Sequence, residues 1–232
     1  MTAIENINSN PAAPAAMLAV DRAAHDFRRG RPVSICDEAG NSIIALASEV
    51  STDQAITRLS ELGGTEPSIA ITHHRARTLK VRLYTDEIIL IPYKSWRTAA
   101  IARTIADPTN DLSNPLGGPY TASRDPVNSA SVAAVQLAKI SRLLPSVILV
   151  DYENGRDGAL AEDGIATIDA SNIISYEMDT AGSLRQVTAA RVPLEDAENL
   201  FQHIDHLSWH TIEQNSPSPS SSSSPQFLFL FL

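Results

Sequence analysis

The chain has 232 residues, 43% of them apolar, and a formal charge of −9. The length suits one domain with appendages, and the negative charge disfavours binding to nucleic acid or anionic membranes, whose phosphates would be repelled. The single cysteine, Cys36, excludes an intramolecular disulfide and a multi-cysteine zinc site. Because the N-terminus also lacks a basic start followed by an apolar run, the sequence predicts a cytoplasmic protein without a membrane partner.

The N-terminal segment has two parts with different compositions. Residues 1–16 are small, polar and rich in Pro and Ala, which is typical of a disordered lead. A helical period begins at Leu18, and the helix is expected to end at Gly30 because Pro32 prevents its continuation. We therefore expect the folded domain to cover residues 17–190.

Helical and strand-like periods alternate through the rest of this domain. The first segments predict strand, strand, helix and strand, over residues 33–35, 43–46, 52–62 and 67–73. A strand, a helix, a long Pro/Gly-rich loop, an amphipathic helix and a strand follow, over residues 88–91, 96–106, 107–126, 129–144 and 146–152. A short strand and a helix or turn complete the pattern, over residues 164–169 and 170–178. This order predicts an α/β (α+β) fold of three layers, with a mixed central sheet between helices.

The stretch "ITHHRARTLK" lies where a strand passes into a helix. Thr72 is placed to act as the N-cap of a helix over residues 73–79. His73 and His74 are adjacent, so their side chains point about 100° apart on a helix and do not converge on one ion. A phosphate bound at the helix start beside Arg75 and Arg77 is a second interpretation, since helix N-termini attract anions. A capped helix with solvated polar residues is the simplest interpretation.

The order of several segments resembles 3,4-dihydroxy-2-butanone 4-phosphate synthase, an enzyme of riboflavin biosynthesis that acts on ribulose 5-phosphate. The matching segments are "AVDRAAHDFRRGRPVSICD", "IALASE", "SIAITHHRARTLKV", "SASVAAVQLAKISRLLPSVILVDY" and "GIATIDASNIISYEM". "SLRQVTAARVPLEDAEN" resembles the junction that leads into a GTP cyclohydrolase II domain. The chain as a whole resembles the N-terminal, synthase-like region of alphaproteobacterial-type GTP cyclohydrolase II, over residues 18–199. The resemblance implies the synthase fold and a homodimer formed through this module.

The sequence departs from the synthase at the positions that the resemblance implies are catalytic. The family has a long acidic loop between its first two strands, where carboxylates hold magnesium, and this chain has only "CDEAGNS", with Asp37 and Glu38 as remnants. The family's metal-binding His falls on Ala130 and its Glu on Val132. Neither replacement binds Mg²⁺ or transfers a proton. We therefore expect no catalytic residue and no metal site in this module.

The C-terminal part lacks the signature of the cyclohydrolase. That enzyme binds zinc through three cysteines, so zinc would belong to a cyclohydrolase domain, and we expect no cofactor in this chain. Residues 191–199 are expected to begin the junction, and residues 200–232 to form a low-complexity, disordered tail. His203, His206 and His210 have helical spacing, but the Ser/Pro-rich run that follows disfavours a metal site there.

Three functions remain open at this stage. The first is a truncated GTP cyclohydrolase II-like protein, whose degenerate module has a scaffold or dimerisation role in riboflavin biosynthesis. The second is a stand-alone module of the same fold that binds a sugar phosphate or nucleotide, and the third is an unrelated interaction protein. For the second, the candidate ligand-binding residues are Thr72, His73, His74, Arg75 and Arg124.

Overall fold

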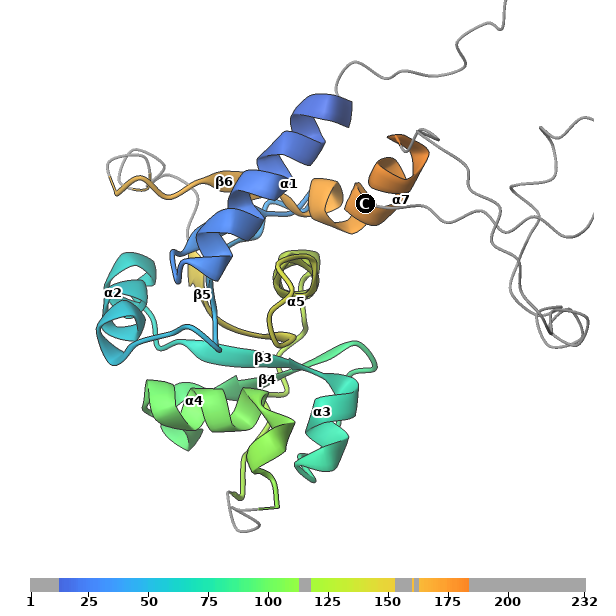
Figure 1. Ribbon diagram of the computed structural model, residues 1–232. Coiled ribbons are helices and arrows are strands. Elements are labelled where there is room, and N and C mark those ends of the chain that lie inside the picture. Colours follow the sequence, from blue (N-terminus) through green and yellow to red (C-terminus); the bar gives the residue numbers. More distant parts are fainter. Residues whose placement is uncertain (1–12, 113–117, 153–159, 161–162, 184–232) are drawn as a thin grey trace, which may run out of the picture. The chain divides into compact units, whose positions relative to one another are not determined.

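The computed structural model describes residues 13–112, 118–152, 160 and 163–183 (Figure 1). The α-helices are α1 (Ala13–Arg28), α2 (Asp53–Gly63), α3 (His73–Thr78), α4 (Ala99–Ala106), α5 (Ser129–Ile140) and α7 (Ala170–Ser183). The strands are β1 (Val33–Cys36), β2 (Ser42–Ala47), β3 (Ser68–Thr72), β4 (Ile88–Pro92), β5 (Ser146–Tyr152) and β6 (Thr167–Asp169). Two short 3₁₀ helices, η1 (Tyr93–Ser95) and η2 (Pro108–Asn110), flank α4. No helix in these ranges is long and apolar enough to cross a membrane.

The six strands form one mixed sheet in the order β4-β3-β5-β2-β1-β6. Neighbouring strands from β4 to β1 are antiparallel, and β6 alone pairs in parallel, with β1. The longest pairing joins β2 to β5 at the centre, from Ser42 opposite Tyr152 to Ala47 opposite Val147. These strands are buried on both faces, which explains why β2 is almost wholly apolar rather than alternating.

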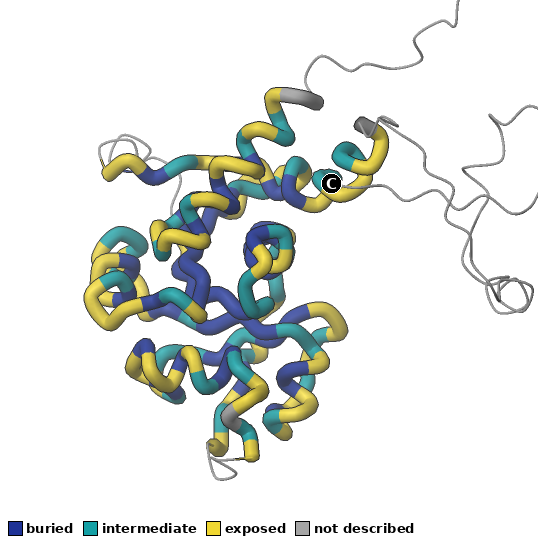
Figure 2. Tube along the Cα trace, viewed as in Figure 1, coloured by how far each residue is buried: buried dark blue, intermediate teal, exposed yellow. Residues whose placement is uncertain are grey.

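Helices cover both faces of the sheet, so the predicted three-layer α/β architecture is confirmed. Alternate residues of β2 point to opposite faces, with Ile43 and Ala45 in one core cluster and Ile44 and Leu46 in the other. The first cluster is completed by α1, α5 and α7, and the second by α2, α3 and α4. Figure 2 shows that the buried residues concentrate along the sheet and on the helix faces turned toward it.

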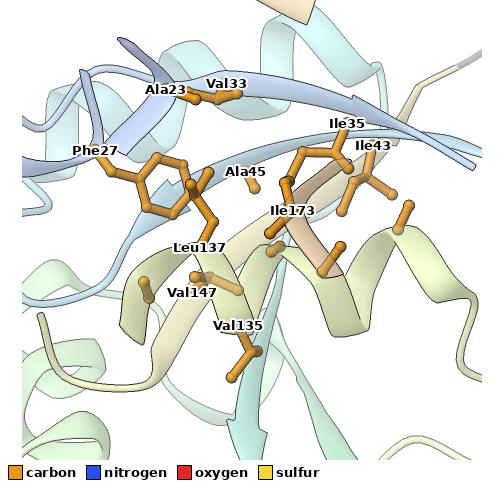
Figure 3. Close-up of a cluster of buried hydrophobic side chains, with 14 of the residues drawn as sticks. Ala23, Phe27, Val33, Ile35, Ile43, Ala45, Val135, Leu137, Val147 and Ile173 are labelled. Carbon is orange, nitrogen blue, oxygen red and sulfur yellow. The ribbon is translucent and has the colours of Figure 1, made fainter. Parts of the chain in front are cut away.

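Helix α5 is the most deeply buried of the helices that the structure describes. Small residues allow it to lie close against the sheet, and Val135 and Leu137 pack with Phe27 and Val147 in the core (Figure 3). The buried residues occupy most of its circumference: Ala130, Ser131, Ala133, Ala134, Val135, Leu137 and Ala138. The amphipathic helix expected over this segment is therefore present, but its solvent-exposed face is narrower than the sequence predicts.

Several predicted boundaries differ in the structure, including the end of α5, which lies at Ile140 rather than at residue 144, and the end of α7, which lies at Ser183 rather than at residue 178. Helix α1 begins at Ala13, inside the lead that was expected to be disordered through residue 16. Alanine has the highest helix propensity and proline is tolerated in a first turn, which explains this start. The helix expected from Trp96 begins only at Ala99, because Trp96 ends η1. Three further predictions lie outside the described residues: the domain end at residue 190, the junction over 191–199 and the tail over 200–232. The three histidines of the tail lie outside them too.

Candidate functional site

The turn between β1 and β2 lies where the sequence resemblance places the synthase's acidic loop. Asp37 Oδ1 accepts hydrogen bonds from the backbone N–H groups of Ala39 (3.0 Å) and Asn41 (2.8 Å). The Asn41 amide also donates to both carboxylate oxygens, at 3.1 and 2.9 Å. Ser129 Oγ, on α5, donates to Asp37 Oδ2 at 3.0 Å. The hydrogen bond from the Asn41 side chain is the main reason that the pKa of Asp37 lies below its usual value.

These contacts give Asp37 a structural role. Five donor contacts surround one carboxylate, and together they close the turn and tie it to the start of α5. A lowered pKa keeps this carboxylate ionised at neutral pH, so it is a poor general acid. Glu38, the other remnant of the acidic loop, is exposed.

The first turn of α5 holds Ala130 and Val132, onto which the sequence resemblance places the synthase's histidine and glutamate. Asn128 caps the helix, and its Oδ1 accepts from Ser131 N (2.8 Å) and Ser131 Oγ (2.7 Å). Ala130 is fully buried in the first core cluster, and Val132 packs partly buried against the same cluster. Both positions therefore contribute to the apolar core and have no polar group to offer a ligand.

The residues at this place do not fit a magnesium ion. Mg²⁺ requires oxygen ligands in near-ideal octahedral geometry. Here the lone pairs of Asp37 already accept protein donors, and Ala130 and Val132 have no oxygen in their side chains. Within the described ranges, no three His, Cys, Asp or Glu residues are grouped so that they could hold a metal ion.

The candidate residues of the "ITHHRARTLK" stretch lie at the end of β3 and in α3. Thr72 caps α3 as predicted, and its Oγ1 accepts from Arg75 N at 3.3 Å. His73 is partly buried, with Nδ1 3.1 Å from the carbonyl oxygen of Thr85. His74 is exposed and lines a shallow, open depression with Arg77 and Thr78. The two imidazole rings are perpendicular, with centroids 6.1 Å apart, so the histidines do not converge.

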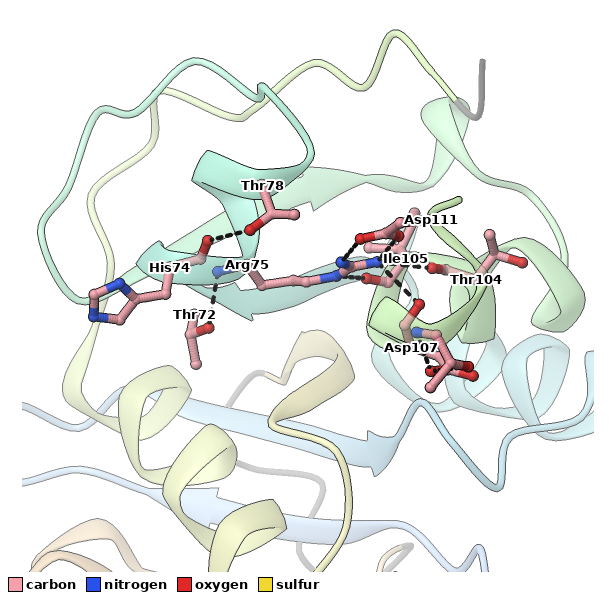
Figure 4. Close-up of polar contacts among 9 residues, drawn as sticks. Thr72, His74, Arg75, Thr78, Thr104, Ile105, Asp107 and Asp111 are labelled. Atoms are coloured by element: carbon pink, nitrogen blue, oxygen red, sulfur yellow. Dashed lines mark hydrogen bonds and ion pairs between the residues drawn. The ribbon is translucent and has the colours of Figure 1, made fainter. Parts of the chain in front are cut away.

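Arg75 is nearly buried and is held within the protein (Figure 4). Its guanidinium group donates to both carboxylate oxygens of Asp111, at 2.5 and 2.8 Å. Nε donates to the carbonyl oxygen of Ile105 at 2.6 Å. Nη2 also contacts the carbonyl oxygens of Thr104 (3.2 Å) and Asp107 (3.1 Å). Arg75 therefore caps the C-terminal end of α4 and fixes the segment after it, which leaves little of the guanidinium group to hold a ligand.

Asp111 is the residue of this cluster that the sequence did not reveal. It lies 36 positions from Arg75, in a loop whose composition gives no sign of the pairing. The hydrogen bonds and charge of Arg75 lower the pKa of Asp111. Nearby, burial raises the pKa of Tyr120.

Arg124, the remaining candidate, lies apart from Arg75. It is exposed, and its Nε donates to the hydroxyl of Tyr84 at 3.3 Å. Its guanidinium carbon is 5.5 Å from the centroid of the Tyr84 ring. The structure thus places Thr72 at the end of β3, His73, His74 and Arg75 at the start of α3, and Arg124 beside Tyr84. Of these five candidates, His74 alone lines the depression of α3 described above. Ligand binding by these residues remains a prediction.

Comparisons with known proteins identify the relatives of this chain. No family model matches it. GTP cyclohydrolase-2 of Azospirillum brasilense is 34% identical over 192 residues, covering 82% of this chain and 50% of that protein. The chain thus spans about half the length of the curated relative that it matches.

Solved structures show the fold. The 3,4-dihydroxy-2-butanone 4-phosphate synthase of Candida albicans superposes with a TM-score of 0.54 at 16% identity, over 68% of this chain and 96% of that one. A 3,4-dihydroxy-2-butanone 4-phosphate synthase in complex with two magnesium ions gives a TM-score of 0.52 at 12% identity, over 71% of this chain and 99% of that one. The chain therefore has the fold of 3,4-dihydroxy-2-butanone 4-phosphate synthase and is related in sequence to GTP cyclohydrolase-2, as predicted for a synthase-like N-terminal region.

Proposed function

We propose that the described module is a catalytically inactive, synthase-like scaffold of a GTP cyclohydrolase II-type protein in riboflavin biosynthesis. One observation carries the proposal: the carboxylate of Asp37 is committed to closing a short turn, beside an α5 whose Ala130 and Val132 pack in the core. A synthase site needs groups that bind a cation and move protons. At this place the chain has hydrogen-bonded and apolar groups instead.

The scaffold role is proposed to act through a homodimer. Large apolar side chains are exposed on α7, where Ile174 and Met178 lie one turn apart with exposed fractions of 55% and 81%. Residues four apart lie on the same side of a helix, so these two offer an apolar strip. A second copy of the chain that covers this strip would remove apolar surface from water.

Sedimentation equilibrium of the full chain tests the scaffold role. We expect a dimer at micromolar concentration, weakened by the double substitution Ile174→Glu and Met178→Glu. The matched control is Glu177→Gln with Asp179→Asn, which leaves the apolar strip intact and should preserve the dimer. A wild-type chain that sediments as a monomer throughout would contradict a dimerisation role.

The alternative function is a module that binds a sugar phosphate or nucleotide. Its support is the exposed His74 and Arg77 along one open depression of α3. Binding of ribulose 5-phosphate or GTP would raise the melting temperature with ligand concentration, because ligands that bind only the native state stabilise it. An increase with either compound that disappears in His74→Ala with Arg77→Gln would favour this alternative over the scaffold.

A further inference from the structure

A pair of arginines beside one exposed tyrosine has no part in the proposed scaffold. In the extended segment before β4, alternate residues point in opposite directions, so Val81 and Leu83 pack toward the second core cluster. Arg82 and Tyr84 consequently face outward, and both are exposed. Arg124 reaches the same tyrosine from a segment 40 residues farther along the chain.

The tyrosine holds both guanidinium groups in place. The guanidinium carbons of Arg82 and Arg124 each lie 5.5 Å from the Tyr84 ring centroid, so the two charges are separated by at most twice that distance. Nε of Arg124 also donates to the tyrosine hydroxyl. The backbone beneath Arg124 is fixed, because Ser123 N donates to the carbonyl oxygen of Leu90 on the edge strand β4, at 2.7 Å. Side chains held in advance lose less entropy when they bind a partner.

No described carboxylate neutralises this arginine pair. Within the ranges that the structure describes, ion pairs involve Arg31, Arg58 and Arg75, and neither Arg82 nor Arg124 forms one. Asp125, next to Arg124, instead accepts a hydrogen bond from Ser123 Oγ at 2.5 Å. Two further exposed cations, Arg77 and Lys80, precede Arg82. The two guanidinium groups thus remain available to an anionic partner, although the exposed residues Asp86, Glu87 and Asp125 lie close to them in the sequence.

We propose that Arg82, Tyr84 and Arg124 bind an acidic, extended segment of a partner protein. Side chains at alternate positions of an extended peptide point the same way, and their Cα atoms are about 6.6 Å apart. Their spacing lies within the largest separation, twice 5.5 Å, of the two guanidinium carbons from each other. Each carboxylate can therefore accept charge-assisted hydrogen bonds from one guanidinium group. All three side chains are exposed, whereas small ligands are usually held in concave pockets. The negative charge of the whole chain disfavours a nucleic acid partner.

Fluorescence anisotropy with a labelled peptide of alternating Glu and Thr tests the proposal on the full chain. We expect saturable binding that weakens about fivefold in Arg82→Gln with Arg124→Gln, since exposed ion pairs contribute roughly 0.2–1 kcal/mol each. Tyr84→Leu retains both charges but removes the ring that positions them, so it should also weaken binding. The matched control, Arg22→Gln with Arg29→Gln, removes the same charge from exposed positions in α1 and directly after it, and should change affinity less than twofold.

Several outcomes would overturn the proposal. These are absence of wild-type binding at low salt, equal weakening in the α1 control, and unchanged affinity in the Arg82/Arg124 variant. Inorganic phosphate and duplex DNA are added separately as competitors, at equal anionic charge. If either displaced the labelled peptide better than the unlabelled peptide did, the site would recognise phosphate rather than paired carboxylates.

Discussion

Replacement of Arg75 by Met should remove the main polar connection between α3 and the segment that follows α4. The substitution keeps an unbranched apolar stem of similar length but deletes every guanidinium contact. Asp111 then loses its partner, and the carbonyl oxygens of Thr104, Ile105 and Asp107 lose their donor. Loss of one partner of a buried ion pair costs about 3–5 kcal/mol. Because Asp111 is 27% exposed and can regain water, we expect about 3 kcal/mol here.

Urea denaturation of the wild type, Arg75→Met and Arg77→Met measures this cost. Arg77 is exposed on the same helix and forms no ion pair with the described carboxylates, so its substitution should change the free energy of unfolding by less than about 0.5 kcal/mol. For a domain of this size, the loss at Arg75 corresponds to a decrease in melting temperature of roughly 6–12 °C. If Arg75→Met cost less than about 1 kcal/mol, the guanidinium group would be free to serve a ligand, and the structural role assigned to it would be wrong.

Three further substitutions test the packing and charge of the fold. Gly63→Ala should destabilise the module by about 2 kcal/mol in thermal denaturation, because the added Cβ would lie 2.6 Å from Val150 Cγ2. In the control Gly182→Ala, the added Cβ has nothing within 4 Å, so the stability should change by less than about 1 kcal/mol. Ala130→His places a polar ring in the core and should lower the free energy of unfolding, measured in urea, by about 2–4 kcal/mol. Lys139→His, on the exposed side of α5, should leave it nearly unchanged. Equal losses in the two variants would contradict the burial of position 130. The pKa of Asp111 is lower in the folded state than in the unfolded state, so its carboxylate stabilises the fold above its unfolded pKa and loses this effect as the pH falls through its folded pKa. The difference in free energy of unfolding between wild type and Asp111→Asn should therefore shrink below about pH 4. A difference that stays constant from pH 7 to pH 3 would exclude this linkage.

Local sequence signals predicted most of the elements, because their causes lie within a few residues. Thr72 caps α3 and Thr52 caps α2, and Gly64 ends α2 in the left-handed conformation, as side-chain oxygens and glycine ordinarily do. The continuous apolar run of Ile43, Ile44 and their neighbours indicated a central strand, and β2 lies there next to β5. The start of α4 was mispredicted because Trp96 packs its ring in the core and donates Nε1–H to Ile91, which ends η1 before the helix begins.

The candidate site was less predictable, because its contacts join distant segments. The sequence showed that Asp37 remains from an acidic loop, but not that Ser129, 92 positions away, would donate to it. Arg75 was a plausible anion ligand until Asp111 was found beside it. Arg124 was a candidate, and only the structure showed that Tyr84 pairs it with Arg82.

The central claim is that the synthase-like module has lost its catalytic function. The most direct measurement is Mg²⁺-dependent release of formate from ribulose 5-phosphate by the full chain, with an authentic 3,4-dihydroxy-2-butanone 4-phosphate synthase as the positive control. We predict no formate above the enzyme-free background, because Asp37 is held by the turn and Ala130 and Val132 lie in the core. Formate release that requires Mg²⁺ and is abolished by Asp37→Asn would contradict the account.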